Sequence, residues 1–287
     1  MRILLLLTSL TLLLAACGGG SASAPTSTST TGQLSLIATD KPLDHALVED
    51  ARIWVDQIRI HHESDGSSGF YELYAGTPIE LDHDGLINGI TQGLVDADLP
   101  AGSYKQLRLH LSSARLELTN GNVYQTQDDS LKLTSQDTSG YKVMFDPAIE
   151  VIGGLKREVL LDFDLSKTFK PVPASDPLTA TTYHLHPVIK VAVLSESGEV
   201  RGVVTEDDGT GALVGVVGAS LYLLPPGETD LNEAITSTAT GAAGSYALLG
   251  VAPGTYDVAA VFGPKTARLD GVVVAAGSYS TADLTVQ

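Results

Sequence analysis

The side chains best suited to chemistry in this chain are histidines, and all seven lie before residue 187. His184 and His186 are two residues apart, so on a strand both would project from the same face. Neutral imidazoles so placed can ligate zinc or copper, with His110 or an acid from a neighbouring strand completing the site. The other interpretation is a solvated strand face beside Lys190. We favour the solvated face, because the spacing fixes no third ligand.

Acidic side chains are abundant but form no recognisable catalytic set. The segment DHDG at 82–85 looks like the start of a calcium loop, yet Leu86 occupies the next odd position, where such a loop needs an oxygen ligand. Asp128-Asp129 and Asp207-Asp208-Gly209 fit ordinary turns. The sequence contains no G-x-S-x-G, P-loop or H-E-x-x-H motif. We therefore predict a protein that is not an enzyme and needs no cofactor.

Aromatic rings offer a second kind of site, because an exposed ring can stack on a sugar face. The candidates for glycan binding are Trp54, Tyr71 and Tyr74, with Phe70 beside them. The alternative is packing in a core or between strands, and we prefer it because aromatic residues suit strands.

The only cysteine, Cys17, closes an N-terminal segment with the order of a secretory signal: one cation (Arg2), an apolar run over 3–14, then small residues. The run is shorter than the roughly 20 residues that span a bilayer. A cysteine at this boundary resembles the lipobox of bacterial lipoproteins. The resemblance implies that residues 1–16 are a signal peptide and that Cys17 carries a thioether diacylglycerol and an amide-linked acyl chain.

Residues 17–32 then comprise the acylated cysteine and a flexible tether, rich in Gly, Ser and Thr and without charge. Gly18 follows the cysteine in place of the aspartate associated with inner-membrane retention. We therefore expect a lipid-anchored protein of the cell envelope, in the outer membrane of a Gram-negative bacterium. Its expected partners are the membrane and either a glycan or an envelope protein. With 34 Asp+Glu against 17 Lys+Arg, we expect no nucleic-acid partner.

Period-two alternation dominates residues 33–195 and predicts strands with one wet face, as in antiparallel sheets. Leu107, Leu109 and Leu111 share one face, and the pattern resumes at Leu116 and Leu118. A bulge or bend is therefore expected at Ser112-Ser113. Near the end of this region, residues 159–165 and 185–193 alternate in the same way.

The order of motifs in this region resembles a bacterial family called domain of unknown function 4382. The matching segments are TDKP at 39–42, RIWVDQIRIH at 52–61, FYELY at 70–74 and LPAGSYKQLRL at 99–109. The last is the most specific. A family of unknown function implies nothing about activity.

Residues 199–287 predict a separate sandwich of about seven short strands with glycine turns. TGAAGSY at 240–246 and PGTY at 253–256 resemble motifs of carboxypeptidase regulatory-like, transthyretin-like domains. Gly241 stands where that family has aspartate, so a cation there is not expected. Tyr104 and Tyr256 each follow a Pro-Gly turn, and we expect each hydroxyl to bond back to the turn backbone.

The predicted fold is mainly β, with two antiparallel β-sandwich-type domains in tandem (33–195 and 199–287) after a lipoprotein signal and a flexible tether. Three functions stay open. The first, which we favour, is a non-catalytic envelope lipoprotein that binds a partner or contributes structure. The second is a carbohydrate-binding surface lipoprotein. The third is a metal-dependent site or enzyme around His110, His184 and His186.

Overall fold

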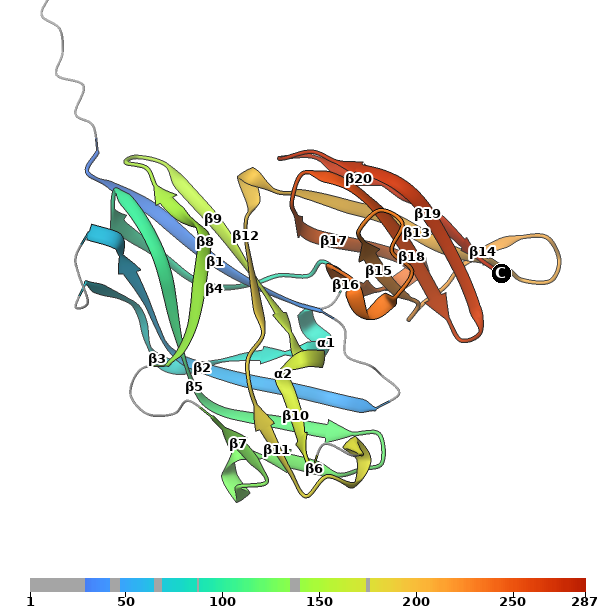
Figure 1. Cartoon of the computed structure of the whole chain (residues 1–287), viewed down its shortest axis with the longest axis horizontal. Coiled ribbons are helices and arrows are strands. Elements are labelled where there is room, and N and C mark those ends of the chain that lie inside the picture. Colours follow the sequence, from blue (N-terminus) through green and yellow to red (C-terminus); the bar gives the residue numbers. More distant parts are fainter. Residues whose placement is uncertain (1–28, 42–46, 65–68, 87, 135–139, 174–175) are drawn as a thin grey trace, which may run out of the picture.

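The structure, a computed structural model, describes residues 29–41, 47–64, 69–86, 88–134, 140–173 and 176–287. The predicted signal peptide, Cys17 and the predicted tether up to residue 28 lie outside the described residues. The described chain is mainly β, as the alternation predicts (Figure 1). Its buried apolar residues form two main clusters. We call the parts that hold them the N-terminal half (29–193) and the C-terminal half (198–287).

The N-terminal half consists of strands with a few short helical turns. Its strands are β1 (Thr31–Lys41), β2 (Val48–His62), β3 (Phe70–Asp82), β4 (Gln92–Pro100), β5 (Gly102–Leu118), β6 (Val123–Gln125), β7 (Leu131–Leu133), β8 (Tyr141–Val151), β9 (Lys156–Asp164), β10 (Phe169–Val172), β11 (Thr182–Leu185) and β12 (Ile189–Val193). Its helical turns are α1 (His83–Leu86), η2 (Thr126–Asp128), α2 (Leu165–Thr168) and η3 (Pro177–Thr179), and η4 (Leu194–Glu196) connects it to the C-terminal half.

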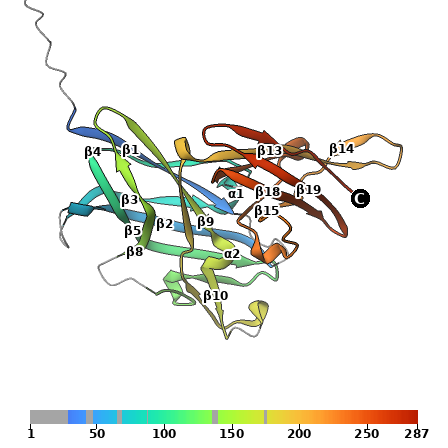
Figure 2. The same ribbon diagram turned by 45° about the horizontal axis from the view of Figure 1, so that its top comes forward.

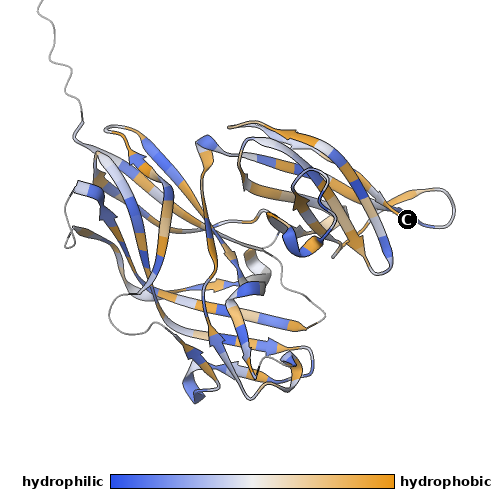
Figure 3. Cartoon of the chain, in the orientation of Figure 1, coloured by the Kyte–Doolittle hydropathy of each residue, from blue (hydrophilic) through white to orange (hydrophobic). Residues whose placement is uncertain are grey.

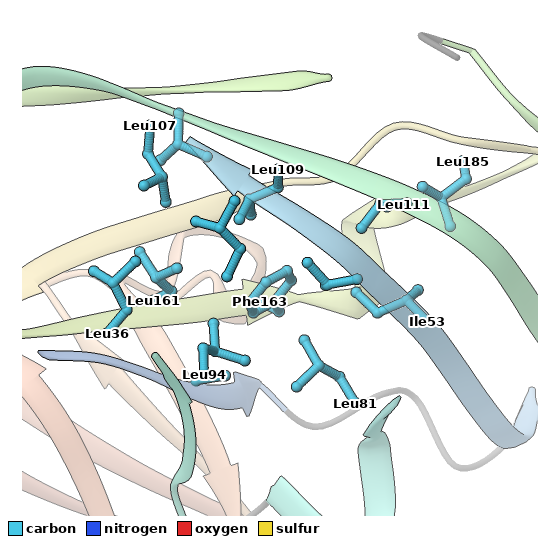
Figure 4. Close-up of a cluster of buried hydrophobic side chains, with 14 of the residues drawn as sticks. Leu36, Ile53, Leu81, Leu94, Leu107, Leu109, Leu111, Leu161, Phe163 and Leu185 are labelled. Carbon is cyan, nitrogen blue, oxygen red and sulfur yellow. The ribbon is translucent and has the colours of Figure 1, made fainter. Parts of the chain in front are cut away.

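These strands form three sheets. Sheet I has the order β12-β9-β1-β4, sheet II has β3-β2-β5 with β6 and β8 both paired to β5, and sheet III has β10-β11-β7. Sheets I and II lie over one another as two layers in the turned view (Figure 2). Side chains from β5 and β2 of sheet II meet Leu161 and Phe163 from β9 of sheet I between the layers (Figure 4). We call the opposite side of sheet II its outer face.

Strand β5 shows how the sequence pattern sets the core. Leu107, Leu109 and Leu111 are buried, and burial then shifts phase to Ala114, Leu116 and Leu118. On the neighbouring β2, Trp54 pairs with Ser113 and Val55 with Leu111, which leaves Ser112 as the extra residue of a bulge. The predicted irregularity is confirmed, and it keeps the leucines on both sides of it in the same core.

Strand direction differs in part from the antiparallel expectation. Most strand pairs are antiparallel, including β1 with β4. The exception in sheet I is the pair of β1 and β9, which is parallel. Alternation predicts which face a residue occupies and carries no information on the direction of the partner strand.

The burial of Leu160 differs from the sequence prediction. The alternation places Leu160 on the solvent-exposed face of its strand, yet it is only 1% exposed. The C-terminal half covers it: a side chain at Gly250 would meet Leu160 Cδ2 at 2.9 Å.

The C-terminal half is a sandwich of two sheets. Its strands are β13 (Gly198–Asp207), β14 (Leu213–Gly215), β15 (Ser220–Leu224), β16 (Thr236–Ala239), β17 (Ser245–Val251), β18 (Gly254–Phe262), β19 (Lys265–Val274), β20 (Tyr279–Thr281) and β21 (Leu284–Val286), with turns η5 (Leu231–Glu233) and η6 (Ala242–Gly244). One sheet has the order β16-β15-β18-β19. The other has β14-β13-β17, with β20 and β21 parallel to β13. Apolar and polar residues alternate along these strands (Figure 3).

Both predicted tyrosine corners are present. Tyr104 Oη donates to the Pro100 carbonyl at 2.9 Å, and Tyr256 Oη donates to the Ala252 carbonyl at 2.9 Å. Each bond closes the turn that leads into its strand, so both tyrosines have structural partners.

The two halves contact one another directly. The Asn88 backbone N–H donates to Thr238 Oγ1 at 3.0 Å, and Thr236 Oγ1 donates to Asp162 Oδ2 at 3.3 Å. These bonds join residues far apart in the sequence and, with the packing over Leu160, fix one half against the other.

Candidate functional site

The aromatic candidates lie on two different faces of sheet II. Trp54 is on the outer face, where its indole Nε1 donates to Glu80 Oε2 at 3.2 Å. Tyr71 and Tyr74 are half-buried and pack against the hydrophobic cluster on the inner face. Their ring faces therefore do not join Trp54 in one platform. Glycan binding by these three residues stays a prediction.

The histidine candidates lie on two different sheets. His110, on β5 of sheet II, has Nδ1 2.5 Å from Asp56 Oδ1. His184 lies in β11 of sheet III and His186 directly follows that strand, and their ring centroids are 6.4 Å apart. The structure thus brings two of the three together and places the third on another sheet.

The surroundings of His184 favour an anion over a metal cation. It pairs with Lys170 on one neighbouring strand and with Lys132 on the other. Two ammonium groups beside an imidazole oppose a divalent cation. In the part of the chain that is described, no group of three or more His, Cys, Asp or Glu side chains is arranged to hold a metal ion.

A groove of about 420 Å³ lies between the two halves. The N-terminal half contributes residues from β1 and from the segment before β4, and the C-terminal half contributes β13, β17 and β20. The lining residues that matter here are Ile37, Thr91, Glu199, Arg201, Leu249 and Tyr279. Clefts between domains are a preferred place for ligand sites, so this groove is the candidate site of the molecule.

The two charged side chains and the aromatic ring of the groove come from two adjacent parallel strands. Glu199 of β13 pairs with Tyr279 of β20, and Arg201 lies two residues further along β13 on the same face. The Arg201 guanidinium carbon is 4.9 Å from the Tyr279 ring centroid, and its Nη2 donates to Glu199 Oε2 at 2.6 Å. The Glu199 carboxylate, through this hydrogen bond and its charge, raises the pKa of Arg201 above its ordinary value.

Tyr279 keeps most of its ring open to solvent, with an exposed fraction of 61%. An exposed ring beside a fixed cation and a fixed carboxylate can bind a polar ligand by stacking and hydrogen bonding.

A second hollow opens on another side of the junction. Two adjoining parts, of about 340 and 240 Å³, share lining residues from β8, β12 and β17. Met144, Asp146, Lys190 and Tyr256 line the larger part. The junction is therefore hollowed at more than one place.

Sequence reasoning missed the groove residues Glu199, Arg201 and Tyr279. One signal was available: the charged pair Glu199 and Arg201 alternates with Val200, which places both on one face of a strand. Tyr279 had no such signal, because its place beside them depends on a parallel pairing.

Among the described residues, no helix is long and apolar enough to cross a membrane. No curated protein matches this chain.

Solved structures with some similarity include two pilins and one further bacterial protein. The Bacillus anthracis TIE protein is 11% identical, with 90% of this chain and 34% of that protein covered and a TM-score of 0.24. GBS52, the minor pilin of Streptococcus agalactiae, is 10% identical, with 89% and 95% covered and a TM-score of 0.23. The shaft pilin SpaA of Lactobacillus rhamnosus GG is 12% identical, with 90% and 97% covered and a TM-score of 0.24. This chain thus spans about a third of the Bacillus protein, and similarity this low supports no functional conclusion.

The family comparison is specific. The model described as Domain of unknown function (DUF4382) matches residues 31–187, which is more than half of the chain and nearly all of the N-terminal half. The match confirms the resemblance carried by the segments at 39–42, 52–61, 70–74 and 99–109. This chain belongs to the DUF4382 family.

Proposed function

We propose that the protein is a lipid-anchored binding protein of the cell envelope, whose two non-catalytic β domains (33–195 and 199–287) hold a ligand in the groove between them. The observation that carries the proposal is the groove itself, with the exposed Tyr279 ring beside the Arg201–Glu199 pair. The ligand is unidentified.

The anchor rests on the N-terminal sequence. A signal over 1–16 with Cys17 at its end fits an acylated mature N-terminus, and two or more acyl chains hold a protein stably on a membrane. The tether up to residue 32 separates the β domains from the lipid. Gly18 after the cysteine favours the outer membrane of a Gram-negative bacterium.

A carbohydrate ligand is the second candidate, and the exposed Tyr279 ring favours it. Sugar rings present apolar faces with hydroxyl edges, which suit an aromatic ring flanked by a guanidinium and a carboxylate. The motifs at 240–246 and 253–256 add the proposal that the C-terminal half is a carboxypeptidase regulatory-like domain.

The test is retention of the detergent-solubilised full chain on neutral polysaccharides and peptidoglycan. Retention that is lost with Tyr279→Ala and kept with Trp54→Ala supports the groove. Loss with Trp54→Ala alone moves the site to the outer face of sheet II and contradicts the groove. No retention on any of these materials contradicts a glycan ligand, and the search then turns to an envelope protein.

Calcium, zinc and chelator arms of the same experiment test the metal alternative. Retention that needs zinc and disappears with His184→Ala would support a site around His110, His184 and His186. Retention that is unchanged by chelator contradicts it.

A further inference from the structure

Three cations lie side by side across the outer face of sheet II. Arg59 of β2 is directly opposite Arg108 of β5, and Arg108 is directly opposite Lys142 of β8. Neighbours of all three, such as Ile58, Leu107 and Val143, point into the core, so by alternation the cations point outward. Adjacent strands are about 4.8 Å apart, which places three positive charges within roughly 10 Å.

Like charges directly opposite one another destabilise a sheet, so the row is unexpected on stability grounds alone. It is more unexpected in a chain of net charge −17. Arg115 and Lys105, which also lie in sheet II, have acidic partners. Arg115 Nη1 lies 2.6 Å from Asp50 Oδ2, and Lys105 is paired with Glu63.

Arg108 and Lys142 lack such partners. Among the described residues, no carboxylate forms an ion pair with either, and the buried Nε of Arg108 has no hydrogen-bond acceptor. The carboxylate at the end of the row, Glu72 opposite Arg59, accepts a hydrogen bond from Gln57 Nε2 at 2.8 Å. An unpaired buried donor and a row of cations are what an oxyanion would satisfy.

Phe70 orients the central guanidinium. The Arg108 guanidinium carbon lies 4.1 Å from the Phe70 ring centroid, close enough for a cation–π contact. Arg59 lies over the same ring at 6.0 Å. The contact with the Phe70 ring thus limits the orientations open to the Arg108 guanidinium.

We propose that Arg59, Arg108 and Lys142 form a binding site for an oxyanion: a sulfate, phosphate or carboxylate group, either free or carried by an acidic polysaccharide. The site lies on the outer face of sheet II and does not depend on the groove between the halves. Its success or failure is therefore separate from that of the proposed function.

The experiment measures binding of the detergent-solubilised full chain to dextran sulfate, polygalacturonate and neutral dextran at low salt, with free sulfate as competitor. Arg108→Gln and Lys142→Gln each remove one cation of the row. Lys105→Gln is the matched control, because it removes the same charge from the same strand β5 but from a residue paired with Glu63. Lys142 is exposed, so its variant keeps the test valid should Arg108→Gln fail to fold.

We expect binding to a charged polymer and not to neutral dextran, with affinity reduced roughly tenfold or more by Arg108→Gln or Lys142→Gln. Lys105→Gln should change it by less than about twofold. Binding of free sulfate without binding to either polymer supports the same oxyanion site with a small ion as ligand. Binding to none of these probes, or an equal loss with Lys105→Gln, overturns the proposal.

Discussion

At the residue scale, Asp257 is a buried carboxylate satisfied on both oxygens. Oδ2 accepts from the Gly227 N–H at 2.7 Å and from Arg268 Nη2 at 2.6 Å, and Oδ1 accepts from the Gly271 N–H at 2.8 Å. The Gly227 and Gly271 hydrogen bonds and the Arg268 charge outweigh burial and lower the pKa of Asp257. The charged form is thus held by one loop, through Gly227, and by strand β19, through Arg268 and Gly271.

This pKa shift predicts acid sensitivity of the C-terminal half. Because the folded pKa lies below the unfolded value of about 3.9, the contribution of Asp257 is complete above that value and is lost as pH falls toward the folded pKa. Asp257→Asn should lower the melting temperature at neutral pH, and the difference from wild type should shrink below about pH 4. Asp270→Asn, at an exposed partner of Arg268, is the control. Thermal melts across pH measure both; a constant difference at all pH values would contradict the role of the charge.

Tyr104→Phe tests the first tyrosine corner. The side chain is fully buried, so losing its hydroxyl leaves the Pro100 carbonyl without that donor. We expect a loss of about 1 kcal/mol in the free energy of unfolding of the N-terminal half. Tyr256→Phe, whose bond is exposed, should cost less. Urea unfolding, followed by one spectroscopic probe in each half, measures the loss of unfolding free energy for both variants. A larger loss for Tyr256→Phe than for Tyr104→Phe would contradict this prediction.

At the element scale, the turn between β16 and β17 depends on Gly244. Its φ is +75°, and a Cβ there would lie 2.2 Å from the Val204 carbonyl oxygen. Gly209 has a similar φ of +87° but no atom within 4 Å of the same position. Gly209→Ala should therefore cost only the backbone strain of about 1–2 kcal/mol. Gly244→Ala should cost clearly more. Equal losses in unfolding free energy for the two variants would contradict the prediction that the close approach to the Val204 carbonyl of β13 excludes a side chain at Gly244.

Element positions could be predicted from the sequence where alternation is strong, and pairing could not. The phase shift in β5 was visible in its leucines because each step of two returns to the same face. The pairs of β1 with β9 and of β13 with β20 are parallel. The sequence pattern of each strand by itself does not indicate its parallel partner. The candidate site was missed for this reason, since it depends on the second of these pairings.

At the scale of the whole molecule, the groove exists only when both halves are assembled. Ile37 and Thr91 come from the N-terminal half, and Tyr279 comes from the end of the chain. Burial of Leu160 on the side predicted to be wet has the same origin. A sequence pattern reports a residue's neighbours within its own sheet, whereas contacts between halves depend on the completed fold.

At the same scale, we propose that a lipid on Cys17 anchors these β domains to the envelope. The most direct measurement is metabolic labelling with a palmitate analogue in a bacterial host, followed by detergent phase partition, for the full chain and for Cys17→Ser. We predict that the wild-type chain is labelled and enters the detergent phase, and that Cys17→Ser does neither. An unlabelled wild-type chain in the aqueous phase, or equal labelling of Cys17→Ser, would contradict the claim.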